Sequence, residues 1–252
     1  AAKMCLILVA WHAHPNFPLV VAANRDEFYA RPTAPSARCP NSPQIIGGRD
    51  LEAGGTWLGV SEQGHFAAVT NVREPGIAKG RLSRGELTRN FLESRQSPDA
   101  YLATLDFAAY SGFNLLISDG NSLYYASNRG PQAQRLAPGV YGLSNHLLDS
   151  PWPKLISARE RFSLALDKLP ASQHFFDILG DDEIVPDDQL PETGVPLEWE
   201  RRLSAIFVRS QEYGTRASTL VTVNVEKSLF FEERNFGANG QPLQSSVIST
   251  GV

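Results

Sequence analysis

Short apolar runs dominate the first 75 residues of the chain. Their length and their content of Val, Ile, Leu and Phe are typical of buried strands. We predict strands at 5–10, 19–23, 57–60 and 66–70. A turn rich in Pro and His joins the first two runs, which predicts an antiparallel hairpin. The segment 31–43 carries four prolines and indicates an irregular surface loop.

Helical signals follow these strands. Ser83, with Glu86 three residues later, predicts the start of a helix that ends near Ser94. Pro98 predicts the first turn of a second helix. We predict further helices at 152–169 and 172–179, and further strands at 113–118, 123–127, 141–144, 219–225 and 229–233. This order of elements favours one α+β domain over residues 1–252, with helices outside two stacked sheets.

Composition excludes several classes of function. The net charge of −4 argues against a nucleic-acid partner bound through electrostatics. No apolar stretch approaches the roughly 18 residues that a membrane-spanning helix needs, and the apolar run at Cys5 is too short for a secretory signal, so we expect none. The two cysteines form no disulfide framework, so we expect a reducing, cytoplasmic setting. The partner that we expect is a small-molecule ligand or substrate. The oligomeric state does not follow from these features.

Charged residues end the second apolar run. Asn24, Arg25, Asp26 and Glu27 follow it directly, and the neighbouring run opens with Cys5. Charges at the rim of a core cost free energy unless they are paired or used. Pairing of the two strands would bring the thiol and this ionic cluster within reach of each other, in one small cavity.

The chain resembles the NRDE family, also called the transport and Golgi organisation protein 2 family. The family is named after the tetrapeptide Asn-Arg-Asp-Glu, which stands at 24–27 in this chain. The resemblance covers seven segments in the family's order: Met4-Cys5, 22–29, 54–59, 68–71, 83–85, 142–145 and 213–219. It implies an N-terminal nucleophile hydrolase-like fold, a four-layer α-β-β-α sandwich of two mainly antiparallel sheets. It also implies that Met4 is the initiator, so we expect Ala1–Lys3 to be an expression remnant.

Cys5 is the first candidate for chemistry. Removal of Met4 would leave Cys5 as residue one, and its α-amine, with a pKa of about 7.7–8.0, could act as the base toward its own thiol. Attached residues 1–4 would lock that amine in a peptide bond and leave the protein inactive. The alternative is that Cys5 is a small buried hydrophobic residue at the start of a strand.

Four further residues are implied as catalytic by resemblance to the penicillin V acylase and bile-salt hydrolase group. Asp26 matches an aspartate that orients the amine, although Ala23 stands where that group has arginine. Asn71 and Asn145 match two asparagines that would donate to the oxyanion. Arg216 matches a late arginine that would stabilise a thiolate or hold a substrate carboxylate.

Structural roles remain open for the same residues. Arginine and carboxylate side chains at strand ends commonly form ion pairs, so Arg25, Asp26 and Glu27 could fix the 31–43 loop. Asparagine is favoured at strand ends for its turn chemistry, and Arg216 could pair with an acid of the tetrapeptide. We also assign Asn24, Arg25 and Trp57 to substrate binding, with Trp57 as one wall of a pocket or as plain core.

Histidines offer a different chemistry. His12 and His14 lie in the first turn, and Cys39 precedes a proline as in Cys-Pro haem-regulatory dipeptides. Members of the family have been proposed to move haem, which needs one or two axial ligands. No motif supports a zinc or nucleotide site.

Three functions therefore stay open. The first is a cysteine amidohydrolase or acyltransferase that acts on an amide, thioester or ester through Cys5 and requires no cofactor. The second is a catalytically silent carrier that binds haem or an acyl lipid in the same pocket. The third is a degenerate scaffold that only folds.

Overall fold

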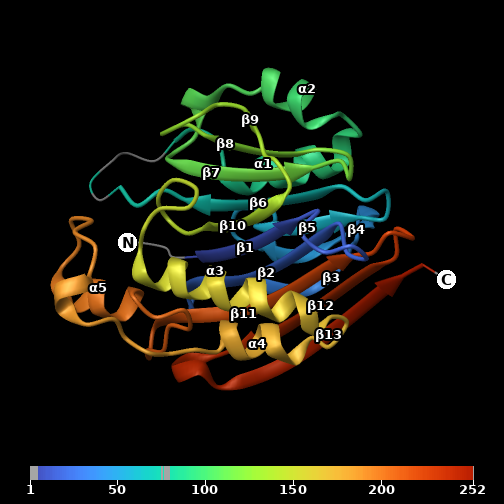
Figure 1. The fold of residues 1–252 in the computed structure, drawn as a ribbon. Helices are drawn as coiled ribbons and strands as arrows, with labels where there is room; N and C mark the ends of the chain where they lie inside the picture. The colour runs from blue at the N-terminus through green and yellow to red at the C-terminus, as the bar shows by residue number, and fades with distance from the viewer. Residues whose placement is uncertain (1–4, 75, 77–79, 252) are drawn as a thin grey trace.

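The strands form two stacked antiparallel sheets in this computed structural model, which describes residues 5–74, 76 and 80–251 (Figure 1). The first sheet contains, in spatial order, β10 (Gly139–Leu143), β1 (Cys5–Trp11), β2 (Leu19–Phe28), β11 (Tyr213–Val223), β12 (Leu229–Phe236) and β13 (Pro242–Thr250). The second contains β3 (Thr33–Cys39), β4 (Ser42–Asp50), β5 (Leu58–Ser61), β6 (Phe66–Asn71), β7 (Phe113–Ser118), β8 (Leu123–Ser127) and β9 (Gln134–Arg135).

Helices cover the outer face of each sheet (Figure 1). The second sheet packs against α1 (Arg84–Ser94) and α2 (Pro98–Ala103). The first sheet packs against α3 (Pro153–Ala165) and α4 (Gln173–Leu179), and α5 (Leu197–Leu203) follows them in the chain. Short 3₁₀ turns lie at Phe107–Ala109, Leu166–Lys168, Asp187–Gln189 and Ala238–Gly240. The layers therefore run α-β-β-α, and the expected α+β fold class is confirmed.

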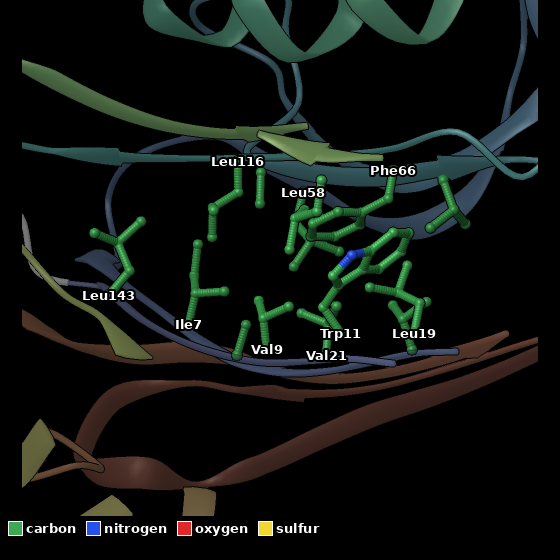
Figure 2. Packing of buried hydrophobic residues seen from close by; sticks show 14 of the residues in the cluster. Ile7, Val9, Trp11, Leu19, Val21, Leu58, Phe66, Leu116 and Leu143 are labelled. Carbon is green, nitrogen blue, oxygen red and sulfur yellow. The ribbon is translucent and has the colours of Figure 1, made fainter. Parts of the chain in front are cut away.

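The first two strands are apolar throughout because both of their faces are buried. Ile7, Val9 and Trp11 point into the core between the sheets, where they meet side chains of the second sheet (Figure 2). Leu6 and Leu8 point the other way and pack beneath α3 and α4. Alternation along a strand sends successive side chains to opposite faces, so a strand between two layers reads as a continuous apolar run.

Strand β2 extends beyond the start of β1. Cys5 pairs with Arg25, so the last residues of β2 have no β1 partner in this register. They continue against β11, where Thr215 pairs with Asp26 and Ala217 with Arg25. Arg216 is the extra residue of a β-bulge between these pairs, a feature that locally bends a strand and redirects a side chain.

The structure contradicts one sequence-based expectation about secondary structure, and a second expectation lies outside the described residues. The irregular loop predicted at 31–43 is wrong, because β3 and the start of β4 occupy most of this segment. Strand β3 is an edge strand, and its register is interrupted between Ala34 and Ala37, which accommodates Pro35. The expectation that Ala1–Lys3 are additional to the native chain falls outside the described residues. Among those residues, none of the helices combines the length and apolar character that crossing a bilayer requires.

Candidate active site

Cys5 is held in place by the two residues that follow β10. Its backbone N–H donates to Asn145 Oδ1 at 2.9 Å, and its carbonyl accepts from Ser144 Oγ at 2.9 Å. Asn145 Nδ2 donates in turn to the carbonyl of Asn71 at 2.7 Å. Asn145 is completely buried. Its amide therefore ties the start of β1 to the end of β6 in the other sheet.

The two asparagines expected to bind an oxyanion thus meet at Cys5 in different ways. Asn145 presents its oxygen to the Cys5 nitrogen, which is the geometry of a group that positions that nitrogen. Asn71 takes part through its backbone carbonyl, and its side chain is half-buried at the end of β6. Their catalytic roles stay predictions.

Cys5 is half-buried as a residue, and its thiol lies in a desolvated environment where nearby carboxylates outweigh the nearby arginine. Burial, followed by the carboxylate of Asp26, raises the pKa of Cys5 to about 12. The backbone N–H of Asp26 donates to the sulfur, and Arg25 is the nearest cationic influence, but both effects are smaller. Because the thiolate is the nucleophile, a thiol with this pKa is inert at neutral pH while Cys5 is joined to the residues before it.

Strand alternation distributes the tetrapeptide over two faces of β2. Asn24 and Asp26 continue the series that faces the helices, whereas Arg25 and Glu27 continue the series between the sheets. Cys5 pairs with Arg25 and so belongs by register to the face between the sheets. The thiol and the Asp26 carboxylate influence each other electrostatically, but by register they lie on opposite faces of the sheet. The expectation that one small cavity holds both groups is therefore wrong for this strand pairing.

Asp26 is buried and is held by β11. Its Oδ1 accepts from Thr215 Oγ1 at 2.7 Å. Burial raises the pKa of Asp26 to about 6, against the opposing effect of Lys154, its main cationic neighbour. A carboxylate with this pKa changes charge close to neutral pH, as groups that transfer protons often do.

Asn24 has a different set of partners from the one that substrate binding would require. Its Nδ2 donates to the carbonyls of Leu179 at 2.7 Å and Ile206 at 2.9 Å, and its Oδ1 accepts from Ser218 Oγ at 2.6 Å. Both amide N–H bonds are therefore used to join β2 to the segments that follow α4 and α5. This leaves no N–H for a substrate.

Arg25 belongs to an ion-pair cluster between the sheets. Its guanidinium lies 4.2 Å from the ring centre of Trp57, 3.5 Å from Asp50 and 3.9 Å from Glu27. Arg31 joins the cluster through Asp50 at 2.7 Å. The structural alternative, an ion-pair cluster that fixes the segment after β2, is therefore present for Arg25 and Glu27, whereas Asp26 lies on the other face of β2 and bonds to Thr215. In this cluster, the guanidinium of Arg25 covers one face of the Trp57 ring.

Arg216 supports the turn after β2. From its position in the β-bulge it donates to the carbonyls of Phe28 at 3.2 Å and of Arg31, and its guanidinium lies 5.9 Å from the ring centre of Tyr29. The main charged influences on Arg216 are Arg25 and Glu27. The predicted contact with a thiolate is absent from these interactions.

A different arginine acts on the thiol. Arg84, the first residue of α1, donates to the carbonyl of Gly112 at 3.0 Å. Burial lowers the pKa of Arg84, and Cys5 is the leading group that opposes this change. A Cβ on Gly55 would lie 2.4 Å from the backbone of Gly85, so glycine allows the start of α1 to approach this closely. The family segment 83–85 is the sequence signal that points to this arginine.

Lys154 is the second residue that sequence reasoning missed. It lies in the first turn of α3, is 6% exposed, and donates from Nζ to the carbonyl of Leu203 at 2.7 Å. Burial lowers its pKa to about 8, and Asp26 is the main opposing influence. A lysine in the first turn of an amphipathic helix gives no sequence signal of burial. Lys154 lines a small cavity with Arg73, Trp152, Pro153, Val185, Pro191, Glu200, Leu203 and Ser204.

The three residues proposed for haem lie away from Cys5. His12 is exposed beside Trp11 at the far end of β1, roughly 20 Å along the strand from Cys5. His14 is half-buried in the same turn, and Cys39 lies in the other sheet. Within the described ranges, no three His, Cys, Asp or Glu side chains are placed to hold a metal ion. Haem ligation stays a prediction, and it would need a site separate from Cys5.

Comparison with known proteins identifies the family. Residues 4–238 match the sequence profile of Transport and Golgi organisation 2. The chain is 35% identical over 260 residues to the Transport and Golgi organization protein 2 homolog of Bos taurus, covering 92% of this chain and 93% of that one. It is 28% identical over 268 residues to Transport and Golgi organization protein 2 of Drosophila melanogaster, covering 91% of each.

A solved structure gives the fold relationship. A mutant conjugated bile acid hydrolase from Clostridium perfringens superposes with a TM-score of 0.51 over 99% of this chain and 92% of that one, at 11% identity. At that identity the likeness concerns the fold alone, which is N-terminal nucleophile hydrolase-like. The chain belongs to the Transport and Golgi organisation 2 family, as the order of its motifs predicts.

Proposed function

We propose that the protein is a cysteine amidohydrolase or acyltransferase when Cys5 is the first residue of the chain. One observation carries the proposal: the Cys5 nitrogen is held at 2.9 Å by the side-chain oxygen of the buried Asn145. An α-amine in this position would be fixed next to its own thiol. Preorganisation of this kind removes the entropic cost of bringing a base to a nucleophile.

The free amine supplies the base that the extended chain lacks. It takes the proton from Sγ and becomes an ammonium, which opposes the effect of burial and of Asp26 on the thiol. Arg84 adds a second positive charge near the sulfur. The resulting thiolate attacks the carbonyl carbon of an amide or thioester.

The attack places negative charge on the former carbonyl oxygen. The half-buried side chain of Asn71, at the end of β6, is our candidate donor to this oxygen. The ammonium of Cys5 then returns its proton to the leaving amine or thiol, and an acyl-enzyme remains on Sγ. Water or an acceptor amine attacks the acyl-enzyme and releases the thiol.

The test compares two chains that differ only in residues 1–4. Both carry Cys39→Ala, so that Cys5 supplies the remaining thiol, and both are treated with an activated acyl thioester and analysed by intact mass. We expect one acyl group per molecule on the chain that begins with Cys5 and none on the extended chain. Cys5→Ala in the shorter chain is the matched control. Absence of labelling at every pH between 6 and 9 would eliminate the nucleophile.

A carrier function is the second proposal, and the raised pKa of the Cys5 thiol favours it for any chain in which Cys5 is not terminal. Such a protein would bind haem or an acyl lipid without chemistry. Haem titration would then give a Soret shift that His12→Ala, His14→Ala or Cys39→Ala removes. A spectrum unaffected by all three changes would leave haem without an assigned ligand.

A further inference from the structure

Two buried charges lie behind Cys5, and one of them, Asp26, is the residue expected to orient its amine. Asp26 is 3% exposed and Lys154 is 6% exposed. Asp26 lies on the helix-covered face of β2, away from the ion-pair cluster of Arg25, and Lys154 lies in α3, which packs on that side of the sheet. A buried charge is retained only where a second charge or a set of hydrogen bonds compensates it.

The other buried charges around them are paired directly. Arg73 donates to Glu200 at 2.9 Å, with both side chains almost fully buried. Arg25 lies 3.5 Å from Asp50 on the opposite face of β2. These pairs are compensated by direct contact, whereas Asp26 and Lys154 form a second, less direct pair of opposite charges in this part of the site.

Neutral groups make the hydrogen bonds of this second pair. Asp26 accepts from the hydroxyl of Thr215, and Lys154 donates to the carbonyl of Leu203. A hydroxyl and a carbonyl orient the two charges without neutralising them. Each of the two is the leading charged influence on the other. Part of the compensation therefore comes from their mutual attraction, which acts through a region from which water is largely excluded.

We propose that Lys154 is a positioning residue of the Cys5 site, whose buried ammonium keeps Asp26 in the carboxylate form. As a carboxylate, Asp26 favours the ammonium form of a Cys5 α-amine, and this ammonium offsets the unfavourable effect of the same carboxylate on the thiolate. Lys154 thereby sets the lower end of the pH range in which the site works. The part that concerns activity rests on the proposed function, whereas the charge state of Asp26 does not.

Several other charged groups influence Asp26 and Lys154, and the test leaves these groups unchanged. Asp26 is also influenced by Arg25, Glu27, Cys5 and Tyr29. Lys154 is also influenced by Arg73, Glu200 and Cys5. Substitution of Lys154 leaves all of these side chains in the protein, so a change in the titration of Asp26 reports on Lys154.

The experiment follows the carboxyl carbon of Asp26 by ¹³C NMR between pH 4 and 9 in the full chain, with Asp26→Asn to assign the signal. We expect Lys154→Met to move the midpoint upward by about one pH unit or more. Lys154→Arg, which retains the charge, should restore the original midpoint. Lys168→Met, at an exposed position, is the control and should not change it. An unchanged midpoint in folded Lys154→Met protein would overturn the proposal.

Two further measurements keep the inference testable. If Lys154→Met does not fold, the side chain of Lys154 is titrated in Asp26→Asn, because coupling between two sites is reciprocal and its midpoint must fall. An unchanged midpoint there also overturns the proposal. In the chain that begins with Cys5, Lys154→Met should move the acid limb of thioester labelling upward by the same amount. If no variant is labelled, the assignment of Cys5 as the nucleophile is wrong. The NMR titrations still decide whether Lys154 controls the charge of Asp26.

Discussion

Replacement of Asn145 by alanine tests the contact on which the proposed chemistry depends. The substitution removes the acceptor of the Cys5 N–H and the donor to the Asn71 carbonyl, at 2.9 and 2.7 Å. A buried polar group that loses its partner costs about 1–3 kcal/mol. Because Cys5 and Asn71 are both half-buried, water compensates part of the loss. We therefore expect the free energy of unfolding to fall by about 2–4 kcal/mol.

Urea denaturation followed by tryptophan fluorescence measures this loss. The midpoint should fall at unchanged slope, since the substitution leaves the surface exposed on unfolding nearly constant. Hydrogen exchange gives the location: amides at the start of β1 should exchange faster, whereas those near Trp11, inside the apolar core of Figure 2, should keep their protection.

An asparagine at the surface provides the matched control. Asn121 is exposed in the turn between β7 and β8, and Asn121→Ala should change stability by less than about 0.5 kcal/mol. If Asn145→Ala behaved like this control, the amide would not be holding Cys5. The positioning argument for the α-amine would then be refuted, whatever the labelling experiments gave.

Three further predictions concern titratable groups. The pKa of Asp26 rises from its ordinary 3.8 to about 6 and that of Lys154 falls from 10.5 to about 8, so stability should fall between pH 4 and 6 and recover between pH 8 and 10. Each limb amounts to about 3 kcal/mol, and urea midpoints that stay constant with pH would contradict it. Burial also raises the pKa of Glu233, so its protonated form is favoured in the folded state, and Glu233→Gln should raise the urea midpoint at pH 7; a lower midpoint would contradict this. In the 252-residue chain at pH 8, iodoacetamide should modify Cys5 about a thousandfold more slowly than in urea, with peptide mapping to separate Cys39; similar rates would contradict the buried thiol.

Much of the fold was predictable because it rests on short-range patterns. Runs that are apolar throughout indicate strands buried on both faces, and β1 and β2 are such strands. The β3–β4 hairpin escaped prediction because prolines normally indicate loops. An edge strand tolerates Pro35, since one side of that strand has no ladder partner. Strand β13 was also missed, because its mostly exposed residues lack an apolar run.

The site was predictable to the extent that it depends on neighbours in one sheet. Pairing of two consecutive strands brought Cys5 opposite Arg25, as the order of the runs implied. Strand alternation also predicts that the charged side chains of the tetrapeptide separate onto two faces of the sheet. A period of two sends Arg25 and Asp26 to opposite faces, so one could pair between the sheets while the other met the helices.

The remaining parts of the site depend on contacts between segments that are distant in sequence. Arg84 influences the thiol because Gly55 lets the start of α1 approach closely, and Lys154 influences Asp26 because α3 packs on the first sheet. Neither contact has a local signature. An isolated arginine or lysine at a helix start is ordinarily solvated, and only burial turns it into a group that controls a carboxylate or a thiol. For this reason the titration of Asp26, which responds to a helix far along the chain, is a more specific test of the site than any substitution within the tetrapeptide itself.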